Sequence, residues 1–174
     1  MSIQTNIQEI KSSLPQHVTL VAVSKTHTVE TVMEAYNAGH RIFGENKVQE
    51  LVSKYEVMPK DIEWHLIGHL QSNKVKYIAA FVSLIHSVDS IKLLEVIDKE
   101  AQKHNRVIDC LLQIHIASEE TKFGVSADEL EELLNSNDFK EMKNIRVVGL
   151  MGMATFTDNM AQVGMEFKFL GNLF

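Results

Sequence analysis

The segment Val18-Thr19-Leu20-Val21-Ala22-Val23-Ser24-Lys25-Thr26 sets a pattern that recurs along the chain: an apolar run, a polar turn and an amphipathic stretch. Five further apolar runs rich in strand-forming residues follow it, at 41–44, 63–67, 82–86, 108–116 and 146–151. Between these runs, apolar side chains recur at helical spacing, as at Val29, Val32, Met33 and Tyr36. Strict alternation of strands and helices predicts a parallel sheet covered by helices.

Local signals indicate where several helices begin and end. Gly39 stands where a glycine commonly follows a helix, and Ser126 with Glu129 has the spacing of a capping box. A leading helix is expected at about 3–14 and a final helix at 159–174, whose apolar seam we expect to be partly uncovered.

Composition limits the classes of function. The chain has 174 residues, with 17 Lys and Arg against 23 Asp and Glu, for a formal charge of −6. This length suits one domain, and an acidic balance without basic clusters argues against nucleic acid or an anionic membrane as a partner. The single thiol, Cys110, is expected to be a small, buried apolar residue. Because one thiol cannot form an internal disulfide, it also indicates a protein of the reducing cytoplasm. No apolar stretch approaches the roughly 20 residues that span a bilayer.

Polar residues stand at the ends of many predicted strands. They include Lys25 after the first, Asn46 after the second, His65 in the third, His86 at the end of the fourth and His115 near the end of the fifth. Parallel sheets place ligand chemistry at the carboxyl ends of their strands. No Gly-x-Gly-x-x-Gly follows the first run, which argues against a dinucleotide site. Because polar residues come from strand after strand, the pattern favours a ligand site at the mouth of a barrel over one in the crevice of an open sheet.

Lys25 itself has two interpretations. At a strand end with little solvent, burial would favour the neutral amine, which is a nucleophile toward aldehydes. Alternatively, the side chain reaches past the end of the strand into solvent.

Five blocks then occur in order along the chain: Val23-Ser24-Lys25-Thr26, Phe43-Gly44-Glu45-Asn46, Trp64-His65-Leu66-Ile67-Gly68-His69-Leu70-Gln71-Ser72-Asn73-Lys74, His86-Ser87-Val88-Asp89 and Gly149-Leu150-Met151. Together they closely resemble the YggS-like pyridoxal phosphate homeostasis proteins, and the resemblance covers nearly the whole chain. It implies a TIM-type (β/α)8 barrel of the alanine racemase N-terminal type.

The resemblance also implies a ligand. Lys25 matches the lysine that holds pyridoxal 5′-phosphate (PLP) as a Schiff base, and Asn46 matches a polar residue beside the cofactor. His65 and His86 match strand-end positions that line the pocket, and Met151 matches an apolar contact to the ring. Members of this family are thought to carry or buffer PLP inside the cell, with PLP-dependent apoenzymes as candidate recipients, and to be monomers.

The chain departs from the family pattern at its C-terminal side. Six βα units are expected where a barrel has eight, and the family's C-terminal blocks, which form the phosphate cup, are absent. Residues 1–174 are therefore expected to form a single PLP-binding barrel domain that is incomplete, with its C-terminal strands missing through truncation. PLP is expected to bind weakly or not at all, and exposed sheet edges could allow association with another chain.

Two smaller features leave alternatives open. His115 stands where many family members have an asparagine, and it either keeps that polar role or is simply a satisfied strand-end histidine. Glu119, Lys122 and Gly124 form a loop reminiscent of the family, or a charged surface loop with a turn glycine.

The residues do not indicate an enzyme. Alanine racemases use two bases, and the second comes from a separate domain for which this chain has no room. Amino-acid racemase activity is therefore not expected. Two alternatives remain: a metal-dependent hydrolase that uses His65, His86 and His115 as zinc ligands, and a structural fragment without a ligand.

Overall fold

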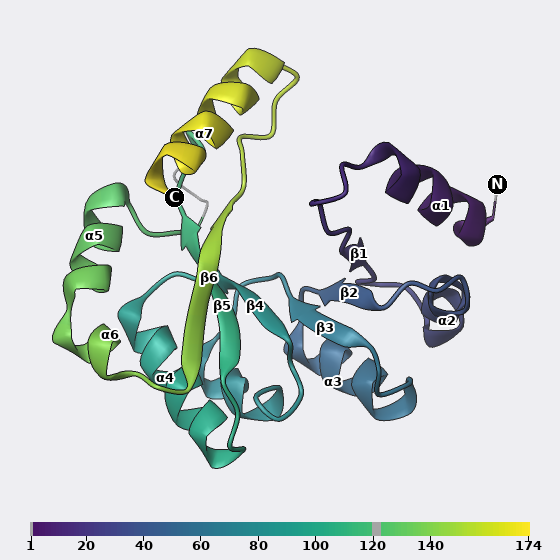
Figure 1. Cartoon of the computed structure of the whole chain (residues 1–174), viewed down its shortest axis with the longest axis horizontal. Helices are drawn as coiled ribbons and strands as arrows, with labels where there is room; N and C mark the ends of the chain where they lie inside the picture. The colour runs from purple at the N-terminus through teal and green to yellow at the C-terminus, as the bar shows by residue number, and fades with distance from the viewer. Residues whose placement is uncertain (1, 120–122) are drawn as a thin grey trace.

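The computed structural model describes residues 2–119 and 123–174. Its centre is a six-stranded sheet in the order β1-β2-β3-β4-β5-β6, in which every neighbouring pair is parallel (Figure 1). The strands are β1 (Ala22–Val23), β2 (Ile42–Glu45), β3 (Glu63–Leu66), β4 (Leu84–Val88), β5 (Ile108–Ile114) and β6 (Ile145–Gly152). The predicted parallel sheet is confirmed.

Helices connect the strands, as the alternating pattern predicts. They are α1 (Ile3–Ser13), α2 (Val29–Asn37), α3 (Val48–Val57), the 3₁₀ helix η1 (Ser72–Tyr77), α4 (Ile91–Lys103), α5 (Ala127–Asn135), α6 (Asn137–Glu141) and α7 (Met160–Leu173). The capping box of Ser126 and Glu129 is formed at the start of α5. Gly39 has a φ of +87°, in the left-handed region expected of a glycine after a helix. The short α6 was not expected from the sequence.

One face of the sheet forms the main core. Phe43, Trp64, Ile85 and Cys110 lie on this face and are at most 1 % exposed. Helix α3 packs beside β2 and β3, and α4 packs beside β5 and β6. Trp64 is therefore a core residue, and Cys110 is buried as expected. Burial raises the pKa of the Cys110 thiol to about 12, which keeps it protonated and unreactive at neutral pH.

Two strands start two or more residues later than predicted. The first strand begins at Ala22 and not at Val18, because it lies at the edge of the sheet and the preceding residues turn, with the Val18 N–H donating to the Pro15 carbonyl. The fourth strand begins at Leu84 and not at Val82. Val82 is buried in the turn that follows η1, where its N–H donates to the Ile78 carbonyl. Val82 is thus buried without joining a strand, whereas Val18 is 43 % exposed.

The sheet is not closed within the described residues, so β1 and β6 form its two edges. Helix α7 follows β6 and extends beyond the carboxyl ends of the strands (Figure 1). Leu170 and Leu173 of α7 pack against the core, whereas Phe167 and Phe174 are 48 % and 88 % exposed. The expected uncovered apolar seam is therefore present. In the described part of the chain, no helix is both long enough and apolar enough to cross a bilayer.

The core predicts a clear contrast between two aliphatic truncations. Leu94 of α4 is fully buried, so Leu94→Ala should lower the free energy of unfolding by about 2–5 kcal/mol. Val57 at the end of α3 is 68 % exposed, so Val57→Ala should change it by less than about 0.5 kcal/mol. Urea unfolding followed by circular dichroism measures both, and equal losses would contradict the packing described here.

Candidate functional site at the carboxyl ends of the strands

Register places the residues that the strands themselves carry on one face of the sheet. Val23, Gly44 and His65 lie side by side across β1, β2 and β3. Their face is opposite the Phe43 and Trp64 core, and we call it the inner face. Lys25 and Asn46 lie just beyond the strands, in the turn that follows β1 and in the bend that follows β2.

Strand pairing carries the inner face to the other edge, with a register shift between β4 and β5 and another between β5 and β6. Leu84 pairs with both His65 and Asp109, and Gln113, four residues beyond Asp109 on β5, pairs with Met151. Met151 therefore also lies on the inner face, near the carboxyl end of β6. Lys25 follows one edge strand, β1, and Met151 lies on the other, so the open sheet holds them at opposite sides of the candidate site.

His65 and His86 are in direct contact. The His86 Nε2 and His65 Nδ1 atoms are 3.0 Å apart, which requires one ring to donate its N–H to the other. Burial lowers the pKa of His65 to about 4, with a further lowering from the nearby His86 imidazole. Burial also lowers the pKa of His86. At neutral pH the pair therefore offers a donor and an acceptor without a net charge.

Lys25 lies in the turn that follows β1 and is exposed. The expectation of a desolvated amine is wrong for this structure, and the alternative of a side chain in solvent is right. The cause is the position of β1 at the edge of the sheet, where even Val23 on the inner face is 49 % exposed.

Asn46 is held where the loops after β2, β3 and β4 meet. The backbone of Asn46 approaches Gly68 so closely that a Cβ on Gly68 would lie far inside van der Waals contact with the Asn46 carbonyl oxygen. Ser87 of β4 donates its hydroxyl to the Gly68 carbonyl at 2.5 Å. Glycine at position 68 is thus what lets the loop after β3 pack against Asn46.

The remaining histidines do not join the pair. His115 hydrogen-bonds through Nε2 to the Glu119 carbonyl oxygen at 2.9 Å, so it is a satisfied strand-end histidine. His69 pairs with Asp89 and stacks on Phe123. Among residues 2–119 and 123–174, no group of three His, Cys, Asp or Glu side chains is arranged to hold a metal. The zinc site proposed for His65, His86 and His115 is therefore wrong for the geometry of the described chain.

The loop of Glu119, Lys122 and Gly124 is only partly described. Gly124 has a φ of +135°, and a Cβ there would meet the His115 backbone nitrogen at 2.5 Å. Glycine is thus required where this loop returns to β5. Lys122 lies outside the described residues.

Sequence reasoning missed Lys54 as a functional candidate. Its ammonium is buried behind the Lys25 turn, where it contacts the carboxylates of Glu45 at 2.6 Å and Glu50 at 2.8 Å. Hydrogen bonding from Lys54 is the largest cause of the lowered pKa of Glu50. The i, i+4 spacing of Glu50 and Lys54 was a readable signal for the pair. Glu45 Oε1 also accepts a hydrogen bond from the Ser24 hydroxyl at 2.6 Å.

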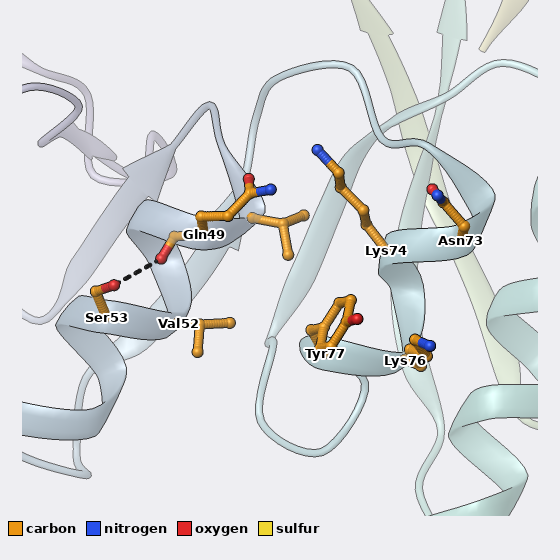
Figure 2. A pocket seen from close by; sticks show the side chains of 8 residues that line it. Gln49, Val52, Ser53, Asn73, Lys74, Lys76 and Tyr77 are labelled. Atoms are coloured by element: carbon orange, nitrogen blue, oxygen red, sulfur yellow. Dashed lines mark hydrogen bonds between the residues drawn. The ribbon is translucent and has the colours of Figure 1, made fainter.

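A separate hollow of about 510 Å³ lies on the outside of the sheet, between α3 and η1. Figure 2 shows Gln49 and Val52 on one wall, facing Lys74 and Tyr77 on the other. None of the predicted site residues lines this hollow.

Comparison with known families covers almost the whole chain. The family described as alanine racemase, N-terminal domain, matches residues 1–170. The pyridoxal phosphate homeostasis protein of Aquifex aeolicus is 43 % identical over 155 residues, which are 88 % of this chain and 67 % of that protein. The protein of the same name from Schizosaccharomyces pombe is 38 % identical over 174 residues, 98 % of this chain and 72 % of that one.

Solved structures give the same relationship in three dimensions. PipY of Synechococcus elongatus without PLP superposes with a TM-score of 0.91 at 34 % identity, covering 99 % of this chain and 80 % of PipY. PipY with PLP bound superposes with a TM-score of 0.86 at 33 % identity, covering 99 % of this chain and 82 % of PipY. Alanine racemase of Clostridium difficile superposes with a TM-score of 0.74 at 13 % identity, covering 98 % of this chain and 46 % of the racemase. At this low identity the comparison shows the shared fold alone.

The histidine pair predicts how stability depends on pH. Because the pKa of His65 is lower in the folded chain, the unfolded chain binds protons more readily between about pH 6.5 and pH 4. Stability should therefore fall on acidification through that window. The shift from 6.5 to about 4 corresponds to at most roughly 3.5 kcal/mol of unfolding free energy, since each pKa unit is worth about 1.4 kcal/mol.

His65→Gln should flatten this part of the pH dependence, because glutamine does not titrate. Urea unfolding at several pH values measures how the free energy of unfolding depends on pH, with wild type and His65→Gln compared first at pH 8. The same slope in wild type and variant would contradict the assignment to His65.

Proposed function

Because this chain belongs to the pyridoxal phosphate homeostasis protein family, which is built on the alanine racemase N-terminal domain, we propose that it binds PLP and helps to regulate the supply of this cofactor. The single observation that carries the proposal is the position of Lys25. It lies in the turn that follows β1, at the carboxyl edge of the parallel sheet, where Asn46 follows β2 and the neutral pair of His65 and His86 lies on β3 and β4.

The side chains at this edge suit an aromatic aldehyde that bears polar substituents. PLP supplies an electrophilic aldehyde carbon, to which a primary amine attaches with loss of water. Lys25 provides that amine, and the Asn46 amide provides a donor and an acceptor for a ring substituent. His65 and His86 line the site without introducing a charge, and Met151 provides an apolar contact.

Exposure of Lys25 suits reversible binding. An amine in contact with water can lose its proton to solvent without help from a buried base. Water can equally reach the attachment point and release the aldehyde. A protein that buffers a cofactor must do both, whereas an enzyme that keeps a resident cofactor benefits from excluding water.

We further propose that residues 1–174 act as one incomplete PLP-binding barrel domain. Support comes from the one sheet and the one cluster of buried apolar residues, from Ile7 to Leu133, that residues 2–119 and 123–174 form. PLP-dependent apoenzymes are the proposed recipients of the cofactor.

Covalent trapping tests the role of Lys25. Wild-type protein incubated with excess PLP and reduced with borohydride should gain the mass of one pyridoxyl phosphate group on the peptide that contains Lys25. Lys25→Ala should lose that adduct completely, because no amine remains at the site. Lys92→Ala, which removes an exposed lysine on α4, is the matched control and should keep it. An adduct that persists in Lys25→Ala would refute the assignment, and no adduct in wild type would favour a structural protein without this ligand.

We also propose that the chain is not an amino-acid racemase. Racemisation needs a base on each face of the substrate carbon, and Lys25 provides one at most. Incubation of the PLP-loaded protein with L-alanine, followed by chiral chromatography, should give no D-alanine above a control with free PLP. Formation of D-alanine at an enzyme-like rate, lost in Lys25→Ala, would overturn this proposal.

A further inference from the structure

The turn that carries Lys25 is fixed from behind by a buried charged cluster, which we call the Lys54 cluster and define as Glu45, Glu50 and Lys54. The Lys54 side chain is 5 % exposed and that of Glu45 is fully buried. The Lys54 ammonium lies 2.6 Å from Glu45 Oε1 and 2.8 Å from Glu50 Oε1, and donates to the Ser24 carbonyl oxygen at 2.7 Å. Its three donors therefore all have oxygen partners.

The cluster bonds the peptide groups on both sides of Lys25. The Ser24 carbonyl belongs to the peptide that joins Ser24 to Lys25, and it accepts from Lys54. The Thr26 N–H belongs to the peptide that joins Lys25 to Thr26, and it donates to Glu50 Oε1 at 2.6 Å. Both backbone torsions of Lys25 are consequently constrained, although its side chain is free in solvent.

Two further features strengthen this constraint. The Ser24 hydroxyl donates to Glu45 Oε1 at 2.6 Å, so the residue before Lys25 is bonded through its side chain as well. Thr26 has a φ of +66°, a left-handed conformation that is uncommon for a β-branched residue. Such a conformation persists where the surroundings determine it, and here the bond to Glu50 does so.

Stability alone does not account for a buried cluster of charges. Apolar side chains of similar volume often stabilise a core as well as a buried ion pair does, because the pair loses its hydration. Here the second carboxylate oxygen of Glu45 is buried without a hydrogen-bond partner among the residues that the structure describes. The cluster instead fixes the direction of the backbone in the Lys25 turn.

We propose that Glu45, Glu50 and Lys54 are positioning residues, which orient the Lys25 amine toward the inner face without touching the ligand. This inference rests on the proposed binding of PLP through Lys25. Its consequence is kinetic: a loosened turn presents the same amine in more directions, and fewer of them suit attack on the aldehyde carbon.

Glu50→Ala is the informative variant, because Glu50 is 24 % exposed and its removal leaves the buried pair of Lys54 and Glu45 in place. Glu56→Ala, which removes an exposed carboxylate from the same helix, is the matched control. Glu50→Gln retains an acceptor for the Thr26 N–H and tests rescue. The rate of covalent attachment is measured from the absorbance change on mixing with PLP, and amide hydrogen exchange at Thr26 is measured without PLP.

We expect Glu50→Ala to slow attachment roughly 10- to 100-fold, with faster exchange of the Thr26 amide and little change in Tm. Glu56→Ala should behave as wild type, and Glu50→Gln should recover most of the rate. A wild-type rate of attachment in Glu50→Ala would overturn the positioning role but not the proposed function. Slower attachment that is fully explained by partial unfolding would have the same consequence. Failure of wild type to form any adduct would instead refute the proposed function.

Discussion

Parallel backbone pairing across all six strands is the constraint on which the rest of this structure depends. It brings the carboxyl ends of the strands to the same edge of the sheet. Residues that are far apart in the chain, such as His65 and Met151, thereby come to lie on one face. The pairing must be specific, because a slip of one residue would turn a strand's side chains to the opposite face.

Burial divides the two faces into different roles. The face that carries Trp64 packs against α3 and α4 and supplies stability through apolar contact. The inner face carries the imidazole pair and the lysine turn, and towards β1 it is open to solvent. Charges behind that turn remain buried only because each has a close partner, as Lys54 has in Glu45 and Glu50. The plane of the sheet thus separates the apolar core from the face to which we assign the proposed binding site.

The exposed lysine and the rigid backbone beneath it are complementary features. Under the proposed function, solvent access to the Lys25 amine would permit proton exchange and release of a bound aldehyde. Hydrogen bonds to the peptides of Ser24 and Thr26 hold the backbone beneath that amine in place. Burial, with a further effect from the neighbouring His86, lowers the pKa of His65 to about 4, so this imidazole is neutral at physiological pH.

The sequence by itself determined the alternation of strands and helices, the capping box at Ser126, the burial of Cys110 and the family relationship. These features depend on residues close together in the chain or on motifs in a fixed order, so local patterns are sufficient to read them. Only the tertiary structure decided that Lys25 is exposed, that His65 meets His86, and that Lys54 is buried against Ser24, thirty residues away. Solvent exposure and ion pairing depend on which distant segments the topology brings together, and a linear pattern does not specify those neighbours.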